Sequence, residues 1–281
     1  MSDKKLEGAG LRGQVAGKTS LSTVGKAGKG LTYRGYPIEV LSEKAKFEEV
    51  AYLLMYGSLP NKDEYENYSS KLISMRSLPN PILEVLERIP ASAHPMDVMR
   101  TGCSMLGNIE PEGEFSNQQE SADRILATMA SIIVYWYKYS HEGKKVNTSS
   151  DYETIGGHFL SLLHGDEPSE DHIRCLDTSL ILYAEHGFNA STFTARTCAS
   201  TLSDIHSCIT GAIGTLRGPL HGGANEAAME LIEQFSTTEE AKSTVLKMLD
   251  NKEKIMGFGH AVYSTEAVSY THLTLPTIDP V

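Results

Sequence analysis

Apolar side chains recur every three or four positions along most of the chain, beginning near Leu41. In residues 44–60, KAKFEEVAYLLMYGSLP, the apolar stripe consists of Phe47, Val50, Ala51 and Leu54. Gly57 is placed to stop this helix, and Asn61 to cap the next one, which continues through Leu72. This period predicts amphipathic helices joined by short loops.

The same period predicts helices in later segments: 82–90, 94–107, 121–141, 170–187, 224–235 and 237–250. The last begins with a capping box, Thr237 to Glu240. Residues 15–38 combine β-branched side chains, alternation and glycines, which indicates short strands and turns. The predicted fold class is therefore all-α, with short β segments near the N-terminus.

Composition excludes several classes of protein. The net charge of -11 argues against nucleic acid as a partner, because phosphate binding needs a basic face. No apolar run approaches the ~20 residues that span a bilayer, so no membrane partner is expected. The cysteines, Cys103, Cys175, Cys198 and Cys208, show no C-x-x-C spacing. Such thiols are typical of a reducing compartment, and we expect a cytoplasmic protein.

Three segments are not explained by packing: YAEHGFNAST at 183–192, LRGPLHGGANEA at 216–227 and KIMGFGHAVY at 254–263. Each places one histidine beside glycine at a helix end: His186, His221 and His260. Glycine lets the backbone approach a ligand closely, and a helix N-terminus offers N–H donors to an anion. Imidazole suits both proton transfer and donation to a developing oxyanion. We therefore expect the chemistry at these histidines.

Other motifs have simpler interpretations. GFGHAV lacks the third glycine and the βαβ context of a dinucleotide fingerprint. His158 and His164 are six positions apart and do not share the face of an H-E-x-x-H zinc site, so they read as helix-end residues. His94, in SAHPMDVMRT, is predicted to be a helix cap or a core contact. No metal site and no cofactor are expected.

The three histidine segments and several further blocks resemble the citrate synthase family. The resemblance runs from about Leu21 to Tyr263 through LTYRGYPIEVL, FEEVAYLLMYGSLP, HPMDVMRTG, AEHGFNASTFTAR, GPLHGGANEA and MGFGHAVY, in the family order. Within the family, AEHGFNASTF, YWYKYSHEGK and GGHFLSLLHG look more like 2-methylcitrate synthases than like hexameric citrate synthases. The resemblance implies a two-domain helical homodimer, with residues 1–222 in the large domain and 223–267 beginning the small one.

The resemblance also implies a Claisen-type condensation of propionyl-CoA or acetyl-CoA with oxaloacetate, followed by hydrolysis of the thioester. His221 would hold the enol oxygen and His260 would polarise the oxaloacetate carbonyl, while His186 and Asn189 would bind oxaloacetate. Coenzyme A, a substrate, would be bound by Leu220, Gly222, Lys252, Lys254, Ile255, Met256, Gly257, Phe258 and Gly259. Two alternatives stay open: a citrate synthase of the tricarboxylic acid cycle, and a non-catalytic helical protein that binds CoA or a dicarboxylate.

Residues 268–281 have no helical period and no recognisable turn chemistry. VSYTHLTLPT back-translates into the adaptor end of transposase-based sequencing libraries, so we expect a non-native tail after an insert that ended near Glu266 or Ala267. The family's proton-abstracting aspartate belongs to a D-x-[FY]-[SA] segment, which does not occur after His260. The printed chain alone is therefore expected to give no condensation.

Overall fold

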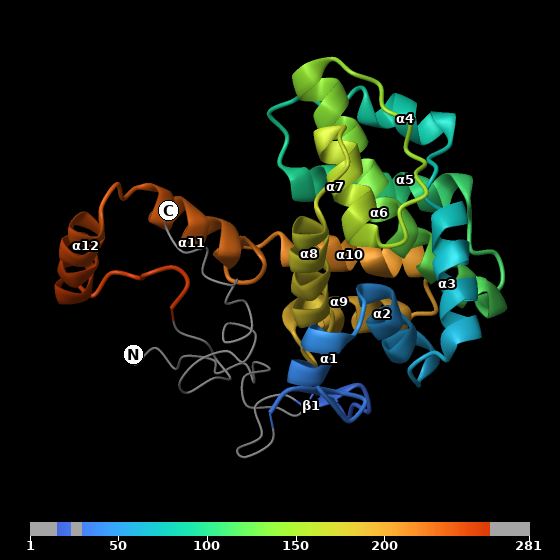
Figure 1. The fold of residues 1–281 in the computed structure, drawn as a ribbon, viewed down its shortest axis with the longest axis horizontal. Helices are drawn as coiled ribbons and strands as arrows, with labels where there is room; N and C mark the ends of the chain where they lie inside the picture. Colours follow the sequence, from blue (N-terminus) through green and yellow to red (C-terminus); the bar gives the residue numbers. More distant parts are fainter. Residues whose placement is uncertain (1–15, 24–29, 259–281) are drawn as a thin grey trace, which may run out of the picture.

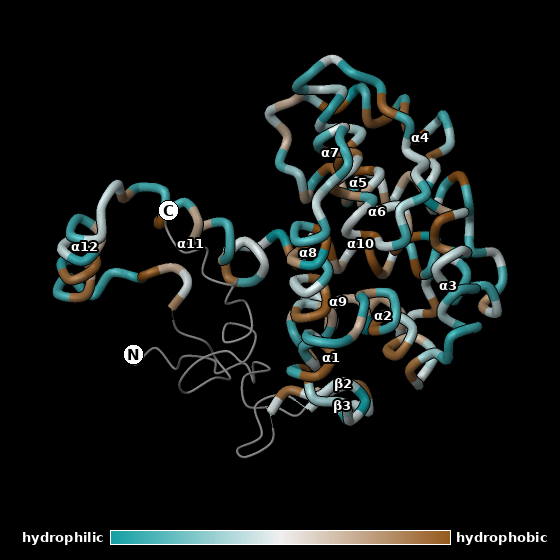
Figure 2. The backbone as a smooth tube through the Cα atoms, in the orientation of Figure 1, coloured by the Kyte–Doolittle hydropathy of each residue, from teal (hydrophilic) through white to brown (hydrophobic). Residues whose placement is uncertain are grey.

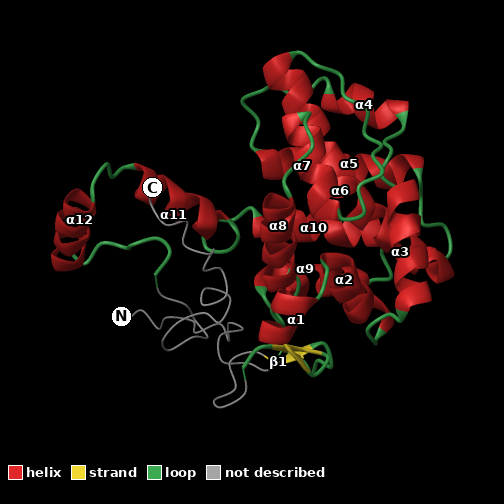
Figure 3. Cartoon of the chain, in the orientation of Figure 1, coloured by secondary structure: helices red, strands yellow, loops and turns green. Residues whose placement is uncertain are grey.

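A computed structural model describes residues 16–23 and 30–258, and its described part is predominantly helical. The short β segments form one antiparallel sheet in the order β1 (Ser22–Thr23), β2 (Thr32–Tyr33) and β3 (Tyr36–Pro37). Thr32 pairs with Pro37 and Tyr33 with Tyr36. Arg34 and Gly35, with φ of 46° and 93°, close this hairpin, and positive φ at both positions is the pattern of a type I′ turn. The predicted N-terminal strands are confirmed (Figure 3).

The first helices begin and end where the sequence signals place them. They are α1 (Ile38–Lys44), α2 (Phe47–Tyr56) and α3 (Lys62–Ser74). Gly57 follows α2 with φ of 106°, and the Asn61 side chain accepts the Glu64 N–H at 3.0 Å. Three members of the predicted stripe, Phe47, Val50 and Ala51, are buried.

The remaining helices of the described chain are α4 (Asn80–Leu86), α5 (Pro95–Ile109), the short η1 (Phe115–Asn117), α6 (Gln118–Glu142), α7 (Ile155–His164), α8 (Glu170–Tyr183), α9 (Ala190–Ala199), α10 (Ile205–Leu216), α11 (Gly223–Glu233) and α12 (Thr238–Asp250). The all-α prediction is confirmed. Two predicted helix ends differ: α4 ends at Leu86 instead of near Pro90, and α8 ends at Tyr183 instead of near Gly187. Pro90 disfavours helical conformation at the residue before it, and the Gly187 N–H bonds the Glu185 carboxylate in place of a helix carbonyl.

Helix α6 runs through the body of the molecule, where Ile132, Tyr135 and Trp136 are buried. Figure 2 shows apolar and polar positions alternating along the helices, as expected for amphipathic elements. A Cβ added at Gly102 of α5 would lie 2.5 Å from Ile132 Cγ2, so this glycine permits the close approach of α5 and α6. Helix α10 packs against both α9 and α5, and this packing carries its C-terminal end to the candidate site.

Helices α11 and α12 lie to one side of the body formed by α1 to α10 (Figure 1). Several of their apolar side chains are exposed: Met229, Ile232, Leu246 and Leu249. No helix among the described residues is long and apolar enough to cross a membrane. His260, Gly259 and the expected tail at 268–281 lie outside the described residues.

Candidate active site

The loop between α8 and α9 contains two of the predicted site residues, His186 and Asn189. Glu185 fixes the loop, since its Oε1 accepts the Gly187 N–H at 2.6 Å and the Ser22 hydroxyl at 2.9 Å. Gly187 has φ of 64°, a conformation that favours glycine. His186 is half-buried in this loop. The loop therefore presents its histidine from an ordered backbone.

Asn189 is the N-cap of α9. Its Oδ1 accepts the Thr192 N–H at 3.0 Å and lies 2.8 Å from Ser191 Oγ. The carboxamide oxygen is therefore occupied by the helix start, and the Nδ2 group is the part of this side chain left to meet a ligand.

His221 lies in a tight turn between α10 and α11. The Gly218 carbonyl accepts the N–H groups of His221 at 2.9 Å and of Gly223 at 3.2 Å. A Cβ added at Gly222 would lie 2.6 Å from the Leu216 carbonyl oxygen, so no larger residue fits this turn. The glycines beside the histidine are thus required by the backbone geometry of the turn.

The turn brings His221 against the first residues of α9. Its Nε2 lies 2.8 Å from Ser191 Oγ and 3.3 Å from the Ser191 backbone nitrogen. Because a backbone N–H can only donate, Nε2 must accept, and the network assigns the ring proton to Nδ1. Burial lowers the pKa of His221, which favours the neutral ring. His221 is therefore a neutral imidazole with one donor, Nδ1–H, that no described residue accepts.

The predicted CoA-binding residues lie on two segments. Leu220, 87% exposed, and Gly222 belong to the His221 turn. The others follow α12, where Lys252 and Lys254 are exposed and Phe258 is 79% exposed. Gly257 has φ of 91°, and a Cβ there would lie 3.2 Å from Ala228 of α11. Within the described chain no hydrogen bond or ion pair joins residues 252–258 to the His221 turn.

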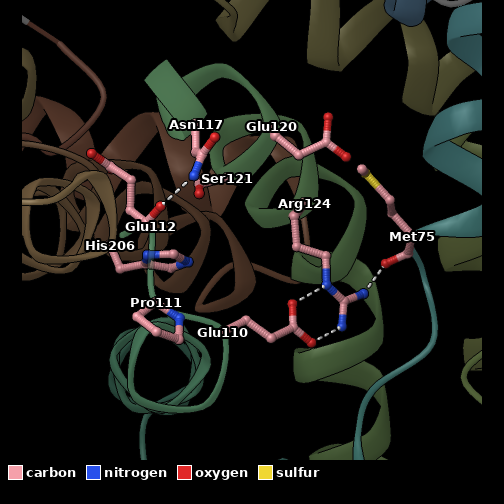
Figure 4. Close-up of a pocket in the computed structure, with 9 residues that line it drawn as sticks. All are labelled: Met75, Glu110, Pro111, Glu112, Asn117, Glu120, Ser121, Arg124 and His206. Atoms are coloured by element: carbon pink, nitrogen blue, oxygen red, sulfur yellow. Dashed lines mark hydrogen bonds and ion pairs between the residues drawn. The ribbon is translucent and has the colours of Figure 1, made fainter. Parts of the chain in front are cut away.

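A separate pocket of about 310 Å³ lies in the body (Figure 4). Its lining residues are Met75, Glu110, Pro111, Glu112, Asn117, Glu120, Ser121, Arg124 and His206. Arg124 is already engaged there, since Nε and Nη2 each donate to Glu110 at 2.7 Å and Nη1 donates to the Met75 carbonyl. None of the predicted site residues lines this pocket, so it is distinct from the candidate site.

Comparison with known proteins decides which family contains this arrangement. A family model described as the C-terminal domain of citrate synthase matches residues 10–273. The 2-methylcitrate synthase of Shewanella oneidensis is 64% identical over 264 residues, which cover 94% of this chain and 70% of that protein. The chain belongs to the citrate synthase family.

Solved structures agree with this membership. The citrate synthase of Thermotoga maritima superposes with a TM-score of 0.82 at 37% identity, covering 94% of this chain and 70% of that one. The citrate synthase of Thermoplasma acidophilum, in ternary complex with carboxymethyl coenzyme A and oxaloacetate, gives a TM-score of 0.84 at 26% identity, covering 91% of this chain and 68% of that one. The citrate-synthase-like fold predicted from the sequence is confirmed.

The candidate site contains one contact that the sequence pattern did not single out. Ser191 is thirty positions from His221 and bonds to it through both backbone and hydroxyl. The only signal was its place in AEHGFNASTF, within the histidine segment 183–192. No group of three or more His, Cys, Asp or Glu among residues 16–23 and 30–258 could hold a metal ion.

Proposed function

We propose that the protein to which these residues belong condenses propionyl-CoA with oxaloacetate and hydrolyses the thioester to 2-methylcitrate and CoA. The observation that carries the proposal is the 64% identity to the Shewanella 2-methylcitrate synthase, in a chain that holds His221 as a neutral, oriented donor. The Thermoplasma relative was solved with carboxymethyl coenzyme A and oxaloacetate, ligands of the same chemical classes.

The proposed step at His221 is stabilisation of the enol. A base removes the α-proton of the acyl thioester, and charge develops on the thioester oxygen. Nδ1–H of His221 donates a hydrogen bond to that oxygen, and one such donor is worth about 3–4 kcal/mol. The enol carbon then forms the new C–C bond to the ketone carbon of oxaloacetate, whose C=O π bond opens while its oxygen takes up a proton. Water adds to the thioester carbonyl carbon and displaces CoA as the free thiol. No carboxylate among the described residues bonds to the His221 ring, whose hydrogen-bond partner is Ser191.

Binding of the two substrates is proposed to follow the predicted assignment. His186 and Asn189 would hold oxaloacetate from the α8–α9 loop, and His260 would polarise its carbonyl. Leu220, Gly222 and the segment that contains Lys252, Lys254 and Ile255 to Gly259 would hold coenzyme A. The position of His221 between the body and α11 supports a site at the boundary of the two proposed domains, 1–222 and 223–267 (Figure 1).

We also propose a cytoplasmic homodimer. The four cysteines are free thiols, in keeping with a reducing compartment. Helix α9 has no buried residue, and Leu202, just after it, is 85% exposed. A second copy packed on this surface would cover it. Sedimentation should give a dimer that Leu202→Asp weakens, and a wild-type monomer at micromolar concentration would contradict the proposal.

The test of the function uses the protein expressed from its own gene, since the printed chain covers 70% of its Shewanella relative. Free thiol is followed after mixing oxaloacetate with propionyl-CoA or with acetyl-CoA. We expect oxaloacetate-dependent thiol release with a higher kcat/KM for propionyl-CoA. A preference for acetyl-CoA would favour citrate synthase, and binding of CoA without thiol release would favour the non-catalytic alternative.

A further inference from the structure

The first turn of α5 contacts the chain on both sides of His221. His94, the N-cap of α5, lies with its Nε2 2.9 Å and 3.1 Å from the two carboxylate oxygens of Glu226, in the first turn of α11. Asp97, three residues later, has Oδ2 3.6 Å from Nε of Arg217, the C-cap of α10. Glu226 follows His221 by five positions and Arg217 precedes it by four, so the catalytic turn is held at both ends.

The hydrogen bonds of His94 assign its tautomer. Nδ1 accepts the N–H of Met96 at 3.1 Å, the bond that caps α5. Because that N–H can only donate, Nδ1 carries no proton and Nε2–H donates to Glu226. One neutral ring therefore serves two elements: Nδ1 completes the start of α5, and Nε2 fixes the start of α11.

The exposure of this pair indicates what it contributes. The side chains of His94 and Glu226 are 21% and 51% exposed. Solvent-exposed polar pairs stabilise folding by only about 0–1 kcal/mol, so loss of the pair should change the melting temperature little. Small displacements of a catalytic group have a larger effect, because about 1 Å of misplacement can lower a rate ~100-fold.

We propose that His94 is a positioning residue for His221, acting through Glu226. The bond from Nε2 to Glu226 holds the first turn of α11, and with it the adjoining turn 218–222, at the distance where His221 meets Ser191 and the substrate. A second contact at the same turn, from the Asn225 amide to the Tyr183 hydroxyl at 3.1 Å, supports this placement from α8. The inference rests on the proposed function, because its effect is on the reaction of His221.

The variants separate the two roles of His94. In His94→Asn the shorter carboxamide still accepts the Met96 N–H, since asparagine is a good N-cap, but it ends short of Glu226. Glu226→Ala removes the same contact from the other side and leaves the cap of α5 intact. Glu226→Gln keeps an oxygen that can accept Nε2–H. Glu230→Ala is the matched control, because Glu230 is exposed one turn further along α11.

The experiment measures kcat and KM for propionyl-CoA condensation in the protein expressed from its gene. We expect His94→Asn and Glu226→Ala each to lower kcat about 10- to 100-fold, with KM for oxaloacetate and melting temperature nearly unchanged. The double variant should be no slower than either single variant, since both remove one contact. Glu226→Gln should recover most of the rate, and Glu230→Ala should match wild type.

Wild-type kcat in both single variants, or additive losses in the double variant, would overturn the inference. Amide hydrogen exchange provides a second measurement that does not depend on activity. Glu226→Ala should speed exchange in residues 218–225 and leave α9 unchanged, whereas Glu230→Ala should do neither. If wild type itself releases no thiol, the proposed function fails, and unchanged exchange in 218–225 would then reject the positioning role separately.

Discussion

Glu48 is a buried carboxyl group whose ionisation should make the stability of the fold depend on pH. Its Oε1 accepts the Ile155 N–H at 2.6 Å at the start of α7, whereas Oε2 has no partner among the described residues. Burial, only partly offset by the bond from Ile155, raises the pKa of Glu48 from 4.5 to about 7. The perturbation that tests this is Glu48→Gln, which removes the ionisation and keeps an oxygen for Ile155.

The raised pKa determines the sign and the size of the effect of Glu48 on the unfolding free energy. The folded chain holds this proton more tightly than the unfolded chain, so the stabilisation is complete below pH 4.5 and is lost as pH rises through about 7. A change from 4.5 to about 7 corresponds to about 3 kcal/mol of unfolding free energy once the group is fully ionised. At low pH the protonated acid buries one unpaired O–H and the amide one unpaired NH2 group, so their stabilities should be closest there.

The assay is denaturant and thermal unfolding at about pH 5 and about pH 8.5. From about pH 5 to about pH 8.5, the unfolding free energy of Glu48→Gln should rise relative to that of wild type by about 2–3 kcal/mol. The corresponding relative rise in melting temperature is about 5–10 °C. Glu43→Gln is the control, because Glu43 is exposed on the neighbouring helix α1. An equal difference between Glu48→Gln and wild type at both pH values would refute the reasoning.

Four shorter predictions concern the site, the body and the tail. Ser191→Ala should lower kcat about tenfold and leave the KM for oxaloacetate nearly unchanged in steady-state assays; a change in KM alone would contradict this role. His221→Ala should lower kcat by ~10²–10³, and full turnover would rule out the donor assignment. Gly107→Ala should lower unfolding free energy by about 1–3 kcal/mol, measured in denaturant, because its Cβ would lie 2.6 Å from His206 Cβ; unchanged stability would mean that α5 and α10 separate freely. Deleting residues 268–281 should leave melting unchanged, and a loss of several degrees would show that they bury surface.

Helices whose signals are local were predicted from the sequence. Gly57 and Asn61 act through their own backbone and the next turn, so α2 and α3 end and begin as expected. Helix α9 was not delimited, because ASTFTARTCA has a weak apolar stripe and no buried residue. A helix whose side chains are at most half-buried in the described chain leaves little periodic signal in its sequence.

The buried ionisable side chains and their partners could not be predicted from the sequence pattern either. Glu48 and Arg76 are fully buried, and His158 is bonded to Ser131 at 2.9 Å and to Ser150 at 2.7 Å. These partners come from distant segments, and periodicity carries no information on which polar groups meet. For the same reason the sequence identified the glycine-rich turn of His221, while the contacts from Ser191 and Glu226 required the structure.

The protonation state of His221 leads to a final prediction. Burial lowers its pKa, and Nε2 already accepts the Ser191 N–H, so protonation would break a bond that the neutral ring makes. Both effects disfavour the imidazolium. The ring should therefore stay neutral below the ordinary histidine value of about 6.5, and activity that depends on a neutral donor should persist there. In the pH profile of kcat, the apparent pKa of the acid limb assigned to His221 should lie below ~6.5. In Ser191→Ala this apparent pKa should rise, because the variant weakens the hydrogen bonding to the neutral ring. An acid limb above that value, unaffected by Ser191→Ala, would mean that the reaction uses a different state of His221.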